Sequence, residues 1–151
     1  MTDFENQIRR EIDANGYHIV IIRAEGDDPG YAFTLGLASN HGHPELCCFG
    51  LDEGEQGGPL HEFLDAAATM VVEGTRFEAG TLVPGLVERF EIAVRAVTPE
   101  RRDEWLGFGA RFHKNRGFEC LQLVWPDQTG RFPWESDCDP RVLAVQPLLD
   151  R

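Results

Sequence analysis

Two histidines and a glutamate alternate along one short segment, and their spacing is the first feature of the chain that could support chemistry. His41, His43 and Glu45 are separated by single residues. An imidazole pair with a carboxylate is a reasonable ligand set for zinc or iron. Pro44 bends the segment, however, and the spacing indicates no further ligand. The alternatives are a turn in which Glu45 accepts backbone N–H bonds, or His43 at the mouth of a pocket.

Thr34 and Gly36 form a second candidate pair. They lie two residues apart in an expected strand, so they share one face of it. A glycine inside a strand often marks a close approach of backbone or ligand. One interpretation is tight core packing. The other is an open face at which the Thr34 hydroxyl binds a flat or phosphorylated ligand.

A third group gathers around a turn at residues 126–130. Its aromatic members are Trp125, Phe132 and Trp134, and its polar members are Gln122, Asp127 and Arg131. Large aromatic side chains usually belong to a core. Aromatic walls with a few polar groups also describe ligand pockets. Both interpretations stay open, and the second would hold a planar ring.

These three groups supply the candidate ligand-binding residues, none of them assigned to a metal. They are Thr34, Gly36, His43, Glu45, Trp125, Asp127, Arg131 and Trp134. We predict that six of them, all but Gly36 and Arg131, lie around one cleft. Polar groups buried apart from one another would be left unpaired, at about 1–3 kcal/mol each. Around a cleft they can satisfy one another, water or a ligand.

The charge of the chain restricts its partners. A net charge of −12 argues against general binding to nucleic acid or to anionic membranes. Residues 95–116 differ, because six basic residues there outnumber three acidic ones. That stretch is either a solvated helix face or a local anion site. The N-terminus lacks the features of a signal peptide, and no apolar run approaches the roughly 18 residues of a membrane span. We expect a cytoplasmic protein.

The length and the cysteines are consistent with a fold that needs no metal or disulfide. A domain of 151 residues buries roughly 70% of its unfolded surface, so we expect residues 1–151 to form a single domain. Cys47, Cys48, Cys120 and Cys138 contain no C-x-x-C pair. We interpret them as small buried hydrophobic residues.

Periodicity and turn residues predict nine elements in the order α-β-β-β-α-β-β-α-β. The predicted helices cover residues 3–15 and 59–73 and a segment that starts at Pro99; the strands cover 17–23, 31–37, 46–51, a short piece near 76–77, 90–97 and 118–125. Residues 38–44 are expected to form a loop, and the tail at 131–151 to be irregular. Gly107 and Gly109 are expected to weaken the third helix and could break it.

This element order predicts an α+β fold. We expect a mostly antiparallel sheet or small barrel with about three flanking helices. Phe4, Ile8 and Ile12 recur every four residues and are predicted to form the buried stripe of the first helix.

Four short motifs, taken together, resemble a bacterial family described as domain of unknown function 4262. They are Y-x-x-T-x-G-L at 31–37, H-P-E-L at 43–46, Q-L-V-W-P-D-x-x-G-x-F-P-W at 122–134 and Q-P-L-L at 146–149. The resemblance covers nearly the whole chain and implies a single-domain bacterial protein. It implies no substrate and no catalytic residue.

Three functions follow as hypotheses. The first is a small-ligand-binding domain with a flavin as candidate cofactor, by analogy with flavin-binding split barrels. The second is a non-catalytic protein-interaction or accessory module. The third is a metal-dependent hydrolase that uses His41, His43 and Glu45. The expected partners are a small molecule and, as a candidate, a second copy in a homodimer, with neither nucleic acid nor membrane. The chain has none of the sequence motifs of serine hydrolases, P-loop nucleotide hydrolases or dinucleotide-binding proteins.

Overall fold

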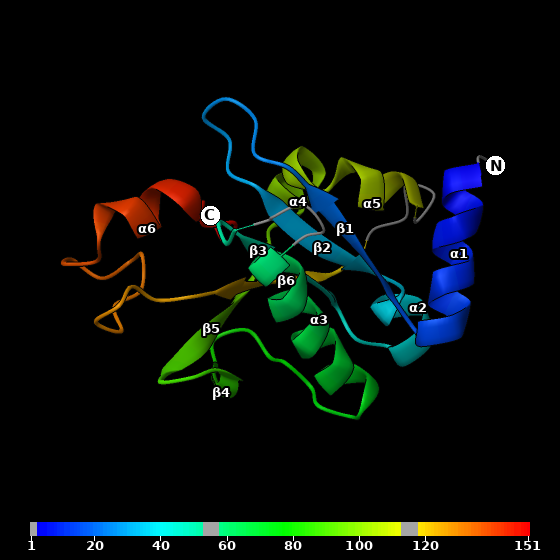
Figure 1. Cartoon of the computed structure of the whole chain (residues 1–151), viewed down its shortest axis with the longest axis horizontal. Helices are drawn as coiled ribbons and strands as arrows, with labels where there is room; N and C mark the ends of the chain where they lie inside the picture. Colours follow the sequence, from blue (N-terminus) through cyan, green and yellow to red (C-terminus); the bar gives the residue numbers. More distant parts are fainter. Residues whose placement is uncertain (1–2, 53–57, 113–117) are drawn as a thin grey trace.

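The chain folds around an open six-stranded sheet with helices on both faces (Figure 1). The computed structural model describes residues 3–52, 58–112 and 118–151. Across the sheet the strands are β1 (His18–Ile22), β2 (Tyr31–Leu35), β3 (Glu45–Phe49), β6 (Cys120–Val124), β5 (Phe90–Ala96) and β4 (Leu82–Val87). Only the β3–β6 pair is parallel. The predicted α+β fold with a mostly antiparallel sheet is confirmed, and the sheet is not closed into a barrel.

Six helices accompany the described strands. They are α1 (Asp3–Asn15), α2 (Leu37–His41), α3 (Gly58–Val72), α4 (Pro99–Trp105), α5 (Gly107–Phe112) and α6 (Pro140–Val145). Three of the six have seven or more residues, which matches the predicted number of flanking helices. The expected break in the third predicted helix occurs at Leu106, between α4 and α5. Within the described residues, no helix has the length and apolar character needed to cross a membrane.

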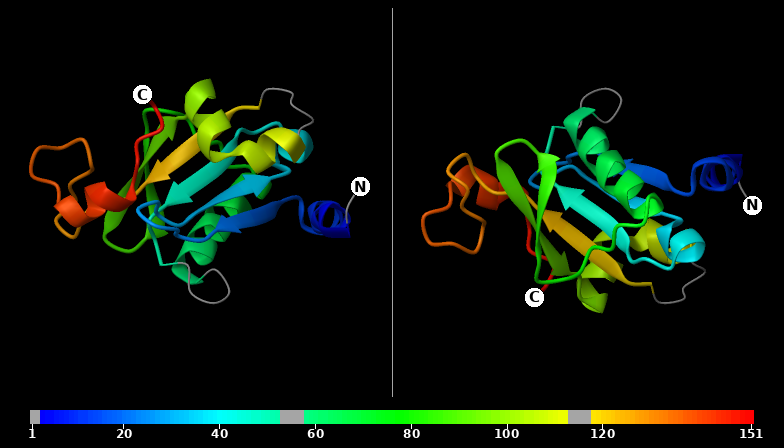
Figure 2. Two further views of the ribbon diagram at one scale, coloured as in Figure 1. Left: turned by 90° about the horizontal axis from the view of Figure 1, so that it is seen from above. Right: turned by 90° about the horizontal axis from the view of Figure 1, so that it is seen from below.

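Both faces of the sheet are buried at its central strands β2, β3 and β6. Helix α3 covers one face, and α4 and α5 lie over the other (Figure 2). Because successive strand side chains point to opposite faces, β3 gives Leu46 and Cys48 to the α3 side, and Cys47 and Phe49 to the other. All four are fully buried, as expected for the two cysteines. This two-sided burial explains the continuous apolar run of β3.

The α1 stripe was predicted with one error. Ile8 and Ile12 are buried, as expected, but Phe4 is 56% exposed. Phe4 lies in the first turn of α1, where it makes an edge contact with the ring of Phe108 at 5.9 Å between centroids. The helix therefore anchors to the sheet through its later turns.

Three other segments differ from prediction. The strand expected near Arg76 and Phe77 is absent, and β4 forms later instead. Pro84 and Gly85 disfavour a central strand, but β4 lies at the sheet edge and is irregular between Val83 and Val87, where such residues are tolerated. The expected loop at 38–44 contains most of α2, and the tail contains α6.

Two glutamines attach the C-terminal tail to β6. Gln122 is fully buried, donates to the Pro147 carbonyl at 2.7 Å and accepts from the Leu149 N–H at 3.0 Å. Gln146 holds Trp125 in the same way, accepting from its N–H at 3.1 Å and donating to its carbonyl at 2.8 Å. The tail is thus an ordered part of the fold, and its Q-P-L-L motif has a structural role.

Candidate functional site

The predicted residues Thr34, Gly36, His43 and Glu45 meet at one end of the sheet, which we call the Glu45 corner. The buried Glu45 carboxylate accepts hydrogen bonds from the Thr34 hydroxyl at 2.8 Å and the Gly36 N–H at 3.1 Å. It also accepts from the N–H groups of Leu37 at 3.2 Å and Ala38 at 3.3 Å. Glu45 therefore holds the start of α2 against the end of β2, as the turn interpretation expected.

Thr34 and Gly36 also serve packing in this corner. The Thr34 hydroxyl accepts from the Leu46 N–H at 2.9 Å, so both its donor and acceptor functions are used. Gly36 has φ 109°, and a Cβ there would lie 3.0 Å from Ile12 and 3.1 Å from the Gly16 carbonyl. The close approach expected at this glycine is therefore made by helix α1 and by Gly16, the residue that follows it.

His43 is held as a neutral imidazole. Its Nε2 accepts from the Phe77 N–H at 2.9 Å, so its Nδ1 carries the proton that it donates to the Pro44 carbonyl at 2.8 Å. Burial of the ring lowers its pKa below 6.5. Both nitrogens are occupied, which leaves His43 no lone pair for a ligand or metal.

The alternating set of His41, His43 and Glu45 does not assemble into a metal-binding geometry. His41 packs against the residue that ends α1, since a Cβ on Gly16 would lie 2.9 Å from its Nε2. Among residues 3–52, 58–112 and 118–151, no group of three His, Cys, Asp or Glu is placed to hold a metal. Geometry therefore gives the hydrolase hypothesis no support.

The aromatic group lies at the opposite end of the parallel pair. The Trp125 indole N–H donates to the Phe49 carbonyl at 2.7 Å, at the far end of β3 from Glu45. Four residue steps along a strand place the two ends about 13 Å apart. His43 and Trp125, which were predicted to share a cleft, therefore lie near opposite ends of β3. Each polar group finds its hydrogen-bond partners near its own end of the sheet, so none needs a shared cleft.

Asp127 organises the loop that follows β6. Its carboxylate accepts from the Thr129 hydroxyl and the N–H groups of Thr129, Arg131 and Asp139, at 2.7 to 3.0 Å. These bonds, led by the Thr129 hydroxyl, hold the Asp127 pKa well below its usual range. Asp127 also lines a shallow depression of about 310 Å³ with Trp125. The Arg131 guanidinium faces outward and pairs with Asp137 at 3.8 Å.

Trp134 already carries two flat neighbours. The Phe132 ring is stacked on it with 5.0 Å between centroids, and the Arg95 guanidinium lies 3.7 Å from its ring centroid. Arg95 in turn pairs with Asp150 at 3.2 Å. Phe132 and Arg95 therefore contact the Trp134 ring that was expected to bind a planar ligand.

Three basic side chains of residues 95–116 are described, those of Arg95, Arg101 and Arg102, and each is engaged by a partner. Arg101 pairs with Glu104 at 2.6 Å, and Arg102 donates to the Phe118 carbonyl at 2.6 Å. Lys114 and Arg116 lie outside the described residues.

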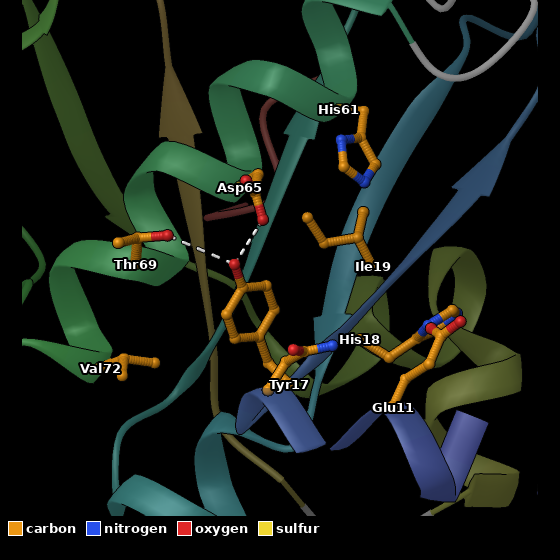
Figure 3. A pocket seen from close by; sticks show the side chains of 9 residues that line it. Glu11, Tyr17, His18, Ile19, His61, Asp65, Thr69 and Val72 are labelled. Atoms are coloured by element: carbon orange, nitrogen blue, oxygen red, sulfur yellow. Dashed lines mark hydrogen bonds and ion pairs between the residues drawn. The ribbon is translucent and has the colours of Figure 1, made fainter. Parts of the chain in front are cut away.

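A different group of polar residues surrounds an open pocket between β1 and α3. The pocket has a volume of about 710 Å³, and we call it the β1–α3 pocket (Figure 3). It is lined by Glu11, Asn15, Tyr17, His18, Ile19, His61, Asp65, Thr69 and Val72. None of these residues was among the predicted site residues.

Helix α3 supplies one wall of this pocket through a polar stripe. His61, Asp65 and Thr69 recur every four residues and lie on one side of the helix. Leu60, Phe63 and the other buried residues of α3 face the sheet instead. The four-residue spacing of polar side chains beside an apolar stripe was the sequence signal that could have located this wall. No comparable signal marked Tyr17 or His18.

Tyr17 is the centre of the hydrogen bonding in the pocket. Its hydroxyl donates to Asp65 Oδ1 and lies 3.3 Å from Thr69 Oγ1 (Figure 3). Burial and the hydrogen bond to Asp65 raise the Tyr17 pKa, so the phenol stays protonated at neutral pH. At the other side of the pocket His18 Nδ1 pairs with the Glu11 carboxylate.

Comparison with known proteins identifies a family whose function is unknown. The model of a domain of unknown function, DUF4262, matches residues 11–139, so the chain belongs to that family. This confirms the resemblance to that family, although the Q-P-L-L motif at 146–149 lies outside the matched residues. No curated protein and no solved structure matches the chain.

Proposed function

We propose that this DUF4262 protein binds a small polar molecule in the β1–α3 pocket. The observation that carries the proposal is the convergence of Tyr17, Asp65 and Thr69 on one open wall. The pocket volume of about 710 Å³ falls within the usual range of small-molecule sites, roughly 300–1,000 Å³.

The incomplete hydrogen bonding of the pocket supports a ligand. Within the described residues, the Asp65 carboxylate makes its one hydrogen bond to Tyr17, and the His61 side chain makes none. Both side chains are partly buried. Polar groups that only support a fold are normally paired within it, as in the Glu45 corner. Side chains that keep free acceptors at a concave surface suit a molecule that brings its own donors.

The proposal concerns a polar molecule rather than a flavin. The flavin hypothesis rested on a small antiparallel barrel, the Thr34 and Gly36 face, the basic stretch at residues 95–116 for a phosphate and the aromatic group for a ring. The sheet is open, and Trp134 is stacked between partners. The β1–α3 pocket has no aromatic side chain apart from Tyr17 and the two imidazoles, and no arginine or lysine to meet a phosphate.

Filling the pocket tests the proposal. Val72 lines the pocket at the end of α3 and is 40% exposed, so Val72→Trp should occupy its volume without disturbing the core. Ala66→Trp is the matched control, because Ala66 is exposed on α3 and does not line the pocket. The probes are mixtures of small amines, polyols, amino acids and carboxylates, screened by saturation-transfer NMR.

We expect at least one compound to bind the wild type and the Ala66→Trp variant, and to lose its signal with Val72→Trp. Binding that survives equally in both variants would place the ligand elsewhere and refute the proposal. Failure of every compound class to bind the wild type would also refute it.

A further inference from the structure

The described lining of the β1–α3 pocket is acidic apart from its two histidines. It contains the carboxylates of Glu11 and Asp65 but no lysine or arginine. The Tyr17 phenol is protonated and therefore neutral, so it does not offset the charge of the carboxylates. Glu11 is paired with His18, so an anionic molecule would meet the Asp65 carboxylate without a lysine or arginine to offset it.

Asp65 differs from the other partly or fully buried carboxylates of this protein. Glu45 and Asp127 each accept from several donors, and Asp150 pairs with Arg95. Asp65 is also withdrawn partly from water, yet in the described part of the chain it contacts one neutral hydroxyl and no cation. A carboxylate in that position favours a positively charged hydrogen-bond donor.

The directions of the hydrogen bonds around Tyr17 also favour a ligand that donates hydrogen bonds. Tyr17 uses its only proton on Asp65, so the phenol oxygen accepts from the Thr69 hydroxyl and keeps one lone pair for the pocket. Thr69 Oγ1 lies 3.3 Å from that oxygen and adds a second neutral acceptor beside Asp65. Two neutral oxygens and one carboxylate oxygen are a suitable set of acceptors for the three N–H bonds of a primary ammonium group.

We infer that the ligand of the β1–α3 pocket is an organic cation whose ammonium group binds Asp65, Tyr17 and Thr69. This inference rests on the proposed function and names the class of ligand. Glu11 is already paired with His18, so it contributes attraction at longer range. The net charge of −12 adds a general attraction for cations, which salt screens.

A series of four-carbon compounds tests the inference. Butane-1,4-diamine, butane-1,4-diol and succinate share chain length and carry positive, neutral or negative ends. Each is titrated into the full chain at constant ionic strength, and amide shifts of residues 17–19 and 61–69 give the dissociation constant. The variants are Asp65→Asn and, as a control with the same charge change, Glu62→Gln, because Glu62 is exposed on α3 outside the pocket. Thr69→Ala is the second pocket variant.

We expect the diamine alone to shift these amides saturably. Asp65→Asn should raise its dissociation constant at least tenfold, which corresponds to about 1.4 kcal/mol. Thr69→Ala should raise it less, and Glu62→Gln by less than twofold.

Three results would overturn the inference. The diol or succinate could bind the same amides as tightly as the diamine, which would leave a pocket ligand of another class. Glu62→Gln could weaken the diamine as much as Asp65→Asn, which would indicate attraction by net charge alone. If no compound shifts the pocket amides and the screen with Val72→Trp also finds no ligand, the proposed function fails with the inference.

Discussion

The Glu45 corner and the β1–α3 pocket contain similar polar side chains, but these side chains have more hydrogen-bond partners in the corner than in the pocket. In the corner, a carboxylate, a hydroxyl and an imidazole are buried, and their hydrogen-bonding atoms are paired with the backbone or with one another. In the pocket, a carboxylate, a hydroxyl, a phenol and imidazoles face an open volume with few partners. Residue type alone does not distinguish the two regions.

The difference shows how the same chemistry serves structure in one place and recognition in another. A buried polar group contributes to stability when its partners are supplied by the fold. A group that keeps free acceptors at a concave surface contributes little to stability and can bind a ligand. Changes in the corner should therefore affect folding, and changes in the pocket should affect binding.

Glu45→Ala is expected to have the largest effect on stability. It leaves the N–H groups of Gly36, Leu37 and Ala38 and the Thr34 hydroxyl without their acceptor. We expect the free energy of unfolding to fall by about 4 kcal/mol or more, measured by urea denaturation. The control Glu62→Ala, on the exposed side of α3, should change it by less than about 0.5 kcal/mol. Equal effects of the two substitutions would remove the distinction between the regions.

Thr34→Val should have an intermediate effect. Valine keeps the shape of the side chain but removes the hydroxyl, which donates to Glu45 and accepts from the Leu46 N–H. The loss of stability should be roughly 1–3 kcal/mol, the cost of leaving a buried group unpaired. A stability equal to that of the wild type would mean that water replaces the hydroxyl and that the corner is open.

His43 should make stability depend on pH in one direction. Burial lowers the pKa of His43 in the folded state, and the nearby Arg76 and His41 lower it further. Glu45 acts in the opposite direction but does not reverse the shift. Above its ordinary pKa of about 6.5 both folded and unfolded forms are neutral, so the stability is fully present. As the pH falls below that value the unfolded chain binds a proton first, and stability is lost.

The measurement for His43 is the free energy of unfolding at about pH 7.5 and about pH 5.5. The decrease between the two should be smaller in His43→Gln than in the wild type. The control Ala66→Gln, on the exposed side of α3, should keep the wild-type decrease. An unchanged decrease in His43→Gln would show that His43 is free to take up a proton in the folded protein.

Asp65→Asn should have the smallest effect on stability. Asparagine can still accept the Tyr17 hydrogen bond, and the side chain faces an open pocket. We expect the free energy of unfolding to change by less than about 0.5 kcal/mol in urea denaturation. A loss of several kcal/mol would make Asp65 a structural carboxylate like Glu45.

The sequence predicted the main elements of the fold where one signal dominated. Helix α1 was predicted at its observed bounds because its apolar period ends at Gly16. Strand β4 was missed because Pro84 and Gly85 hide a strand that an edge position tolerates. Phe4 was assigned to the core because periodicity does not show where a helix extends past the sheet.

The candidate site was harder to predict because pairing depends on tertiary structure. Thr34, His43 and Glu45, which were predicted to share a cleft with Trp125, lie near one another, but the sequence could not show that their hydrogen-bonding atoms are already paired. Tyr17 and Asp65 lie 48 residues apart and meet only when β1 packs beside α3. Only the polar stripe of α3 was visible in the sequence.

A crystal structure with butane-1,4-diamine is the most direct test of the contrast between the two regions. We predict density for the diamine in the β1–α3 pocket, with one ammonium within hydrogen-bonding distance of Asp65 and Tyr17. The Glu45 corner should be unchanged, with its carboxylate still bound to Gly36, Leu37 and Ala38. Diamine bound at the corner, or bound elsewhere while only water fills the pocket, would contradict the assignment of structure to one region and recognition to the other.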